Sequence, residues 1–467
     1  MKLKFIGATE TVTGSKHLIL TEKGKQFLLD CGLYQGLGKE TDELNRHLGI
    51  NPSHIEAVVL SHAHIDHSGN LPYLVKNGFK GKIYCTPATF DACEILLLDS
   101  AHIHESDIRY INKRRLKRGF DPLKPLYTTK DAEECLKRFR PLPYNHEFHL
   151  CDELSFHFTD AGHIIGAAAV QLCANEEGKK IRLSFSGDVG RYNDLILKAP
   201  DDFAQADYII CESTYGNSIH ENPENTEKKL LDIILTTCIE KKGKLIIPAF
   251  SLGRTQELVF LLNNLKNKHL LPKIKVFVDS PLSSKATQVM RKHTECFNET
   301  VKTSLHHDPD PFDFEDLKYI EDSDESKFLN DIQEPCIIIS ASGMGDAGRV
   351  KHHLSNSIGN PNNTVLIAGY CSPGTLGADL LAGHQQVHIF GEVFDVKAGV
   401  ESIQSLSAHA DSTDLLRFLS CQDKEKVKKV FLVHGEPESK IGFRSLLARE
   451  GYKEVIIPEK GESFVLA

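Results

Sequence analysis

The sequence predicts an α/β protein of two domains, one of which is inserted into the other. Three observations lead to this fold class. Residues 1 to about 212 are rich in short strand-like runs, residues 215–393 alternate apolar runs with amphipathic helical stretches, and a strand-rich pattern returns after Val393. We therefore expect a split domain of residues 1–214 and 394–467, interrupted by an inserted domain of residues 215–393.

The length and composition limit the class of protein. At 467 residues the chain is too long for one hydrophobic core, and no segment approaches the ~20 consecutive apolar residues that cross a bilayer. The first residues lack the apolar run of a signal peptide, and the twelve cysteines show no C-x-x-C spacing. We therefore expect a cytoplasmic protein with reduced thiols and no membrane partner.

The formal net charge of -9 argues against a basic scaffold that coats nucleic acid without specificity. An enzyme that acts on nucleic acid stays possible, because bound divalent cations would offset several carboxylates. A local basic stretch, Arg109–Arg118, has two interpretations. It could line a path for RNA, although a solvated helix is the more common role of such a run.

The first domain is predicted to be mostly strands. The expected strands are residues 3–8, 17–22, 26–32, 57–62, 82–86, 154–162, 168–173, 181–188 and 207–214, with a helical stretch at 109–118. After Val393 we expect a helix near 412–420, a strand at 427–436, another helix, and closing strands at 454–458 and 463–467.

The inserted domain is predicted to hold a parallel sheet covered on both faces, because its strands are short continuous apolar runs separated by helices. The expected strands are residues 244–250, 274–279, 336–342 and 364–370, and the expected helices lie near 224–241, at 253–268, from Pro281, near Val350 and from Gly374. The polar, acidic stretch 306–334 is expected to be a loop.

Four side chains that bind metals are crowded into LSHAHIDHSG, residues 60–69, directly after an apolar strand. A tight turn at a strand end can bring such side chains together. His62 and His64 can point to one metal ion, and Asp66 and His67 can point to a neighbouring one. Imidazole and carboxylate ligands without thiolates suit Zn²⁺ or a similar divalent ion in a hydrolytic site.

Further segments repeat this arrangement of an apolar strand that ends in one such residue beside glycine. They contain His163, Asp188 and His434, and Asp30 is a fourth case that could instead orient a ligand histidine. Taken singly, each could be a capping aspartate or a core histidine. Their joint recurrence favours a metal site.

These motifs resemble the metallo-β-lactamase fold, an αββα sandwich with metal ions at one edge. Later segments resemble its β-CASP branch, whose members are chiefly nucleases: CESTYG with Glu212 is similar to motif A, SLSAHAD with His409 to motif B, and FLVHGE with His434 to motif C. The inserted segment, with PAFSLGRTQEL, VDSPLSSKAT and SASGMGDAGR, resembles the β-CASP domain itself. The resemblance covers essentially the whole chain. The proteins that the chain resembles include stand-alone bacterial β-CASP ribonucleases and the eukaryotic 3′-end processing endonuclease.

The resemblance implies two zinc ions per chain. One would be held by His62, His64, His163 and Asp188, and the other by Asp66, His67 and His434, with Asp188 bridging. A hydroxide between the ions would attack the phosphorus atom in line. The catalytic residues would be Asp66, His409 and Glu212, with His409 as general acid or charge stabiliser and Glu212 accepting a hydrogen bond from its ring. A purely structural alternative is that the segment around His409 caps the helix near 412.

Substrate contacts are expected at strand-to-helix turns of the inserted domain, where backbone N–H groups can bind phosphate. The candidate residues are Arg254, Ser342, Gly343 and, within motif B, Ser407. Serine and glycine at such turns are also ordinary helix caps, so this observation supports phosphate binding without requiring it.

RNA is favoured over DNA because relatives that act in DNA repair typically carry an aliphatic residue where this chain has His434. The resemblance thus implies an endoribonuclease that acts on single-stranded RNA, leaves a 5′-phosphate on the downstream product and forms a possible homodimer. The alternatives are an inactive RNA-binding scaffold subunit and a metal-dependent hydrolase of a small ester or thioester. Endonucleolytic or exonucleolytic mode, the RNA itself, and zinc or another divalent ion stay open from the sequence.

Overall fold

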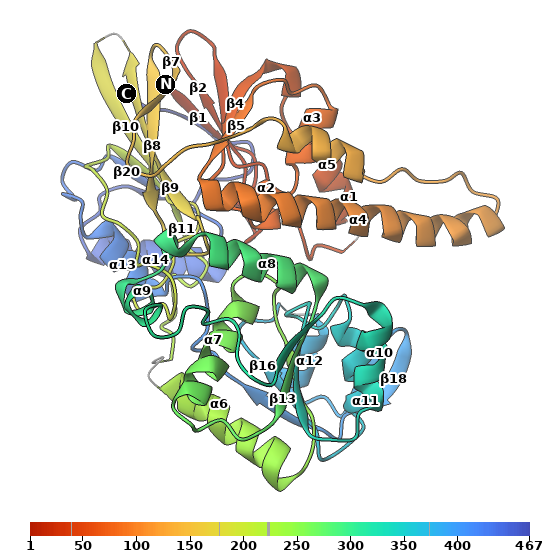
Figure 1. Cartoon of the computed structure of the whole chain (residues 1–467). Coiled ribbons are helices and arrows are strands. Elements are labelled where there is room, and N and C mark those ends of the chain that lie inside the picture. The colour runs from red at the N-terminus through yellow and green to blue at the C-terminus, as the bar shows by residue number, and fades with distance from the viewer. Residues whose placement is uncertain (39, 177, 222–224, 373) are drawn as a thin grey trace. The chain divides into compact units, whose positions relative to one another are not determined.

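The computed structural model of the protein describes all residues except 39, 177, 222–224 and 373 (Figure 1). It folds as two compact units. The first comprises Met1–Ile219 and His409–Ala467, and the second comprises His220–Ala408. The domain limits at residues 215 and 393, which come from the sequence, remain predictions.

The first unit contains two seven-stranded sheets. The first sheet has the order β22 (Ser463–Val465), β1 (Lys2–Phe5), β2 (His17–Leu20), β3 (Gln26–Leu29), β4 (Ile55–Val59), β5 (Lys82–Cys85) and β6 (Phe139–Pro141). The second has the order β21 (Val455–Ile456), β20 (Lys429–Val433), β11 (Tyr208–Glu212), β10 (Lys179–Phe185), β9 (Ala168–Glu176), β8 (Leu154–Asp160) and β7 (Phe148–Cys151). In each sheet one half is antiparallel, and the other half, β3 to β6 or β10 to β21, is parallel.

Strands in the middle of the second sheet are apolar throughout because both of their faces are buried. In β11, Ile210 belongs to the core between the two sheets, whereas Ile209 and Cys211 face the helices on the other side. The core between the sheets also holds Phe5 of β1 and Phe156 of β8. The core between the sheets packs them against each other, and the core on the other side of β11 packs helices against the second sheet.

Helices cover both outer faces of the paired sheets (Figure 1). Beside the first sheet lie α1 (Glu40–Arg46), 3₁₀ turn η1 (Pro52–His54), α2 (Ile65–Ser68), α3 (Leu71–Lys76), α4 (Pro87–Lys117) and α5 (Thr129–Leu136), and on the second sheet lie α13 (Ser412–Leu419) and α14 (Pro437–Arg449). The predicted αββα sandwich is therefore confirmed.

The second unit is built on a six-stranded parallel sheet, as predicted for the inserted segment. Its order is β14 (Leu317–Ile320), β13 (Lys275–Asp279), β15 (Cys336–Ser340), β12 (Leu245–Pro248), β16 (Thr364–Ile367) and β19 (Gly399–Ser402), and a separate hairpin joins β17 (Gln386–Ile389) to β18 (Glu392–Asp395). Its helical segments are α6 (Thr226–Ile234), π-helical η3 (Leu235–Glu240), α7 (Arg254–Asn267), α8 (Pro281–Lys292), 3₁₀ turn η4 (Thr294–Cys296), α9 (Glu299–Ser304), α10 (Ser323–Asp331), α11 (Val350–Ser357) and α12 (Leu376–Leu381).

One expectation for this unit was wrong. The acidic stretch 306–334 is not only a loop, because it contains β14 and α10. The side chain of Asp322 accepts hydrogen bonds from the N–H groups of Asp324 and Glu325, so acidic residues here cap a helix. β19, which follows Val393, pairs with β16 of the second unit. The expected helix start at residue 224 lies outside the described residues.

The twelve cysteines are all free thiols, and most of them are buried. Over the residues that the structure describes, no helix combines the length and the apolar character needed to span a bilayer.

Candidate metal centre

The turn between β4 and α2 places four polar side chains at one end of the first sheet. His62 and His64 follow β4, and Asp66 and His67 lie in the single turn of α2. The backbone of this turn is held by its neighbours: the N–H of Ser15 donates to the carbonyl of Asp66 at 2.8 Å, and the N–H of Cys31 donates to that of His67 at 2.8 Å. The turn is therefore fixed to the sheet by backbone hydrogen bonds.

The remaining side chains come from strand ends in the second sheet. His163 follows β8, Asp188 follows β10, Glu212 ends β11, and His434 follows β20. β10, β11 and β20 are mutually parallel, so their carboxyl ends lie at the same edge. His409 reaches this edge from the segment that precedes α13, where the N–H of Ala410 donates to the carbonyl of Val189.

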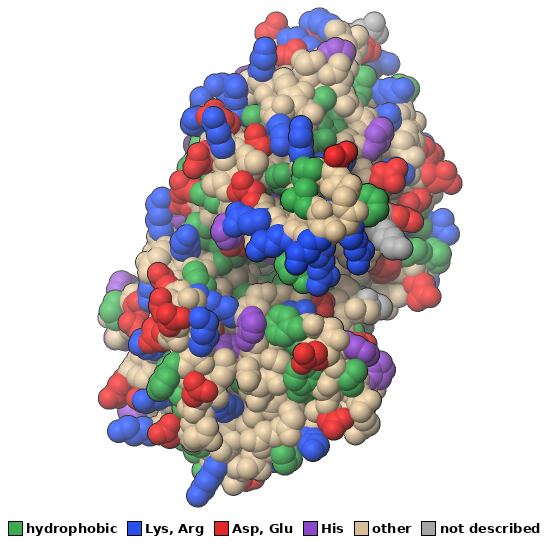
Figure 2. All heavy atoms as spheres, turned by 90° about the vertical axis from the view of Figure 1, so that its right-hand side faces the viewer, with side chains coloured by type: hydrophobic (Ala, Val, Ile, Leu, Met, Phe, Trp, Pro, Cys, Tyr) green, Lys and Arg blue, Asp and Glu red, His purple; other side chains and the backbone are tan. Residues whose placement is uncertain are grey.

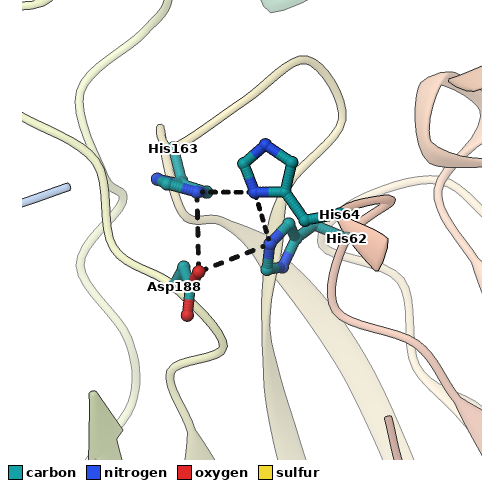
Figure 3. A group of neighbouring side chains, drawn as sticks. All are labelled: His62, His64, His163 and Asp188. Carbon is teal, nitrogen blue, oxygen red and sulfur yellow. Dashed lines mark hydrogen bonds and ion pairs between the residues drawn. The ribbon is translucent and has the colours of Figure 1, made fainter. Parts of the chain in front are cut away.

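The first cluster consists of His62, His64, His163 and Asp188, whose side chains point toward one another (Figure 3). Nδ1 of His64 lies 3.3 Å from Nε2 of His62 and 3.2 Å from Nε2 of His163. Oδ2 of Asp188 lies 3.5 Å from Nε2 of both His62 and His163. Three ring nitrogens and one carboxylate oxygen thus surround one small space.

The second cluster consists of Asp66, His67 and His434. Nε2 of His434 lies 3.2 Å from Nε2 of His67 and 3.3 Å from Oδ2 of Asp66. Oδ1 of Asp188, whose other oxygen faces the first cluster, lies 3.2 Å from Nε2 of His67 and 3.4 Å from Nδ1 of His434. Asp188 therefore lies between the two clusters and directs one oxygen to each.

A metal ion fits this set of donor atoms. Both carboxylate oxygens of Asp188 are buried, and they face ring nitrogens of histidines at 3.2–3.5 Å. A buried carboxylate is costly unless a cation or a protonated group compensates it. The donors are imidazole nitrogens and carboxylate oxygens, which suit a catalytic zinc ion, and no cysteine belongs to either cluster.

The pKa shifts of Asp188 and His67 also favour a bound cation. Burial opposes ionisation of Asp188, but the surrounding histidines outweigh it and hold the pKa of this carboxyl well below its usual range. Burial likewise opposes protonation of His67, yet Asp188 and Asp30 raise its pKa well above the usual range. The centre thus carries concentrated negative charge that attracts either protons or a metal cation.

Asp30 lies behind His67. It is fully buried, and its Oδ2 lies 2.6 Å from Nδ1 of His67. The N–H of Ser61 donates to Oδ1 at 2.8 Å, and the hydroxyl of Ser61 donates to Oδ2 at 2.9 Å. These bonds hold Asp30 in place and direct the other ring nitrogen of His67 toward Asp188.

Glu212 and His409 form a second pair of this kind. Nδ1 of His409 lies 3.2 Å from Oε2 of Glu212. The carboxylate of Glu212 is buried and also accepts hydrogen bonds from the N–H of Val189 at 2.6 Å and the hydroxyl of Thr214 at 2.5 Å. Its oxygens are thus engaged by donors, which suits a positioning role better than metal binding.

His409 lies beside the first cluster. Its ring centre is 4.4 Å from that of His163, and its side chain is more exposed than those of His62 and His163. Burial alone would lower its pKa, but Glu212, helped by Asp188 and Asp66, raises the pKa to about 9. The neighbouring carboxylates thus favour the protonated form of the ring.

The four residues expected to bind substrate belong to the second unit, whereas both clusters belong entirely to the first. Arg254 begins α7 and forms an ion pair with Glu257. Ser342 and Gly343 follow β15. Arg254 follows β12, which is the neighbour of β15 in the sheet. Ser407 is buried near the end of the unit.

Sequence reasoning missed the hydroxyl groups that support the centre. Thr214 contacts both Glu212 and His434, its Oγ1 lying 3.2 Å from Nδ1 of the histidine. Ser61 lies 3.0 Å from Nδ1 of His62 and also bonds Asp30. Ser61 lies in LSHAHIDHSG and Thr214 lies in CESTYG. Their position in sequence beside predicted site residues is the signal that could have identified them.

Models of three protein families match the chain in succession. The metallo-beta-lactamase superfamily matches residues 16–164, the Beta-Casp domain matches 255–380, and the Zn-dependent metallo-hydrolase RNA specificity domain matches 393–458. The first match contains His62, His64, Asp66, His67 and His163 of the two clusters. The third match contains His434 of the second cluster, and also His409.

Several known proteins are similar over nearly the whole chain. Ribonuclease TTHA0252 of Thermus thermophilus is 34% identical over 462 residues, which cover 99% of each chain. An RNase J-like protein of Methanocaldococcus jannaschii is 30% identical over 98% of each chain. Integrator complex subunit 11 of Danio rerio is 28% identical over 99% of this chain and 74% of its own length.

Proposed function

Because the chain belongs to the beta-CASP family of the metallo-beta-lactamase superfamily, we propose that it is a zinc-dependent endoribonuclease that hydrolyses single-stranded RNA. The family makes the chain a metal-dependent hydrolytic nuclease. The choice of RNA is supported by the relatives named ribonuclease and by the match to an RNA specificity domain.

The position of Asp188 carries the two-metal part of the proposal. Its Oδ2 faces His62 and His163, and its Oδ1 faces His67 and His434. On this basis His62, His64, His163 and Asp188 would hold one zinc ion, and Asp66, His67, His434 and Asp188 would hold the other. When bound, such a pair of ions supplies Lewis acidity that activates water and neutralises charge on the phosphate.

The protein's own groups do the remaining work. Asp30 keeps Nε2 of His67 directed into the centre, and Glu212 keeps Nδ1 of His409 occupied. Protonated His409 then donates a proton to the departing 3′ oxygen as its bond to phosphorus breaks. A 5′-phosphate stays on the downstream product, and the upstream product ends in a 3′-hydroxyl.

Phosphate groups of the RNA are proposed to bind at the carboxyl ends of the parallel strands in the second unit. Arg254, Ser342 and Gly343 lie after neighbouring strands there, and helix starts offer backbone N–H groups. Ser407 is assigned to the same task. Variants at these positions should raise KM with little change in kcat.

The test combines metal analysis with cleavage of RNA. Purified protein is expected to contain about two zinc ions per chain and to cut single-stranded RNA that is blocked at both ends. Asp66→Asn and His163→Ala should each abolish cleavage while the circular dichroism spectrum stays unchanged. Asp152→Asn and His307→Ala, at exposed positions, are the matched controls and should keep full activity.

Different results would contradict different parts of the proposal. Full activity of Asp66→Asn would remove the two-metal mechanism. Zinc content near zero would favour the inactive scaffold, and hydrolysis of small esters without action on RNA would favour the third alternative. Cleavage only of RNA with free ends would replace the endonuclease by an exonuclease.

Compartment and assembly complete the proposal. Twelve unpaired thiols suit the reducing cytoplasm. A homodimer is proposed from the family resemblance, and light scattering of the purified protein tests it.

A further inference from the structure

The second half of α4 and the segment after it form an arm of residues 102–125, here called the basic arm. α4 is 31 residues long, which corresponds to about 46 Å at 1.5 Å per residue. Its buried residues all lie between Ala88 and Ala101, and no residue of the basic arm is buried. Figure 1 shows this half of α4 extending beyond the rest of its unit.

The basic arm is nevertheless an ordered structure. The helix ends in a Schellman motif, in which Phe120 N–H donates to the carbonyl of Arg115 at 3.1 Å and Gly119, at φ 72°, donates to that of Leu116 at 3.1 Å. Farther back, the side chain of Asn112 donates to the carbonyl of Leu123 at 2.9 Å and accepts from its N–H at 2.8 Å. The returning segment is thus tied to the helix.

Beyond its base, where His104 and Glu105 contact Tyr127 and Thr129, the arm gains little from packing on its own unit. Helical stability in proteins comes mostly from an apolar face buried in tertiary contacts, and this half of α4 lacks one. An ordered extension without a core therefore has its side chains available for a partner.

The charge of the basic arm is opposite to that of the chain. The stretch 109–118 contains six basic residues and no acidic one, whereas the whole chain carries a net charge of -9. Figure 2, which looks at the side toward which α4 extends in Figure 1, shows Lys and Arg side chains gathered in one group. A concentrated positive patch on an acidic protein selects a polyanion.

Aromatic rings lie among these charges. Tyr110 and Phe120 are 58% and 56% exposed. The guanidinium carbon of Arg114 lies 4.7 Å from the ring centre of Tyr110, and that of Arg115 lies 5.5 Å from that of Phe120. Exposed aromatic rings beside arginine are the elements on which unpaired bases stack, since every base offers a π face.

We propose that the basic arm binds single-stranded RNA away from the bond that is cut, with Lys113, Arg114 and Arg115 pairing with phosphates and Tyr110 and Phe120 stacking on bases. This inference rests on the proposed ribonuclease function. Bases of a duplex are already stacked on one another, so the aromatic contacts favour single strands. A long RNA thereby gains a second anchor on the enzyme.

The test measures RNA binding apart from cleavage. Fluorescence anisotropy with a labelled single-stranded RNA of about 30 nucleotides, in chelator so that the RNA stays whole, gives the affinity. K113Q/R114Q/R115Q should weaken binding by about 10- to 100-fold and make the slope of log affinity against log salt shallower by about 2. Y110A/F120A should weaken binding about tenfold and leave the slope unchanged.

The matched control is K424Q/K426Q/K453Q, which makes the same charge change at the half-buried Lys424 and the exposed Lys426 and Lys453, which pair with Glu450, Asp423 and Glu425. It should bind RNA like the parent protein. Cleavage of an RNA of about six nucleotides, too short to reach a second anchor, should be unchanged in all three variants.

Three results would overturn the inference: equal RNA affinity of the parent and both arm variants, an equal loss in the control, or a changed oligomeric state without a change in RNA binding. The last result would make the arm an interface with a second copy through its exposed Ile111 and Leu116. A protein that binds RNA through the arm but cuts none would contradict the proposed function alone.

Discussion

Nδ1 of His67 lies 2.6 Å from Oδ2 of Asp30, a fully buried carboxylate outside both clusters. Because this bond occupies one ring nitrogen, the other, Nε2, faces Asp188 and His434. The orientation of one proposed metal ligand therefore depends on a residue that does not belong to the ligand set.

Replacing Asp30 by asparagine should weaken the second metal site selectively. The amide keeps the shape of the side chain but lacks the charge that holds the ring of His67. Loss of such a supporting partner typically costs 10- to 100-fold in metal affinity. Chelator titration followed by metal analysis should show one ion leaving at 10- to 100-fold lower chelator concentration while the other is retained. Equal loss of both ions, or of neither, would contradict it.

Gly32→Ala should disturb the same site through the backbone. A Cβ at residue 32 would lie 1.5 Å from the carbonyl oxygen of Asp66, so the turn that carries Asp66 and His67 must move. We expect cleavage to fall at least 100-fold, as a displacement of about 1 Å can cause. Gly359→Ala is the control, because no atom lies within 4 Å of a Cβ there. The prediction fails if both variants cut RNA at the parent rate.

Glu212→Gln should slow the chemical step and spare the metals. The carboxylate accepts from His409, Val189 and Thr214 at once, and an amide group in its place cannot accept all of these bonds. We expect kcat to fall by about 100-fold, as for loss of a general acid, with KM and zinc content retained. His409→Ala should give a similar loss. A fall in zinc content would instead place Glu212 among the ligands.

Asp279→Asn should destabilise the second unit in a pH-dependent manner. Asp279 is fully buried, and His353, Ser326 and Arg349 contact its carboxylate at 2.6, 2.6 and 2.7 Å. Burial alone would raise its pKa, but these contacts outweigh burial and lower the pKa below its ordinary value. The ionised group thus stabilises the fold above about pH 4 and loses this effect as the pH falls further.

Urea unfolding measures the result. At pH 7 the free energy of unfolding should drop by about 2–4 kcal/mol, because buried partners are left incompletely satisfied. The gap between parent and variant should be constant from pH 7 to 5 and narrow only below about pH 4. Asp324→Asn, at an exposed ion pair with Lys327, should change stability by less than about 1 kcal/mol. A difference in the free energy of unfolding that grows as the pH falls would contradict the predicted pH dependence.

The parallel sheet of the second unit followed from sequence patterns because burial on two faces leaves continuous apolar runs, as in β15, whereas the αββα sandwich was implied by the resemblance of the motifs to the metallo-β-lactamase fold. The pairing of β19 did not follow, since a four-residue strand with partly exposed residues has no such signature. The acidic strand β14 lies at a sheet edge and escaped for the same reason.

At the centre, the positions of His62 and His163 after strand ends pointed to residues whose ligand atoms the structure brings within a few ångströms of one another. Sequence spacing could not show which oxygen of Asp188 faces which cluster, because this depends on how the loop after β10 meets the turn after β4. The contacts of Thr214 and Ser61 depend on the same tertiary arrangement.

β20 lies next to β11 in the second sheet, although a whole unit of the chain separates them in sequence. During synthesis the second unit, which is continuous in sequence, has all its strands before β20 leaves the ribosome. The first unit meanwhile lacks two strands of its second sheet and the proposed ligand His434. A chain still being translated would therefore hold an incomplete metal centre, and its nuclease activity would begin only after its own messenger RNA has been read past that codon.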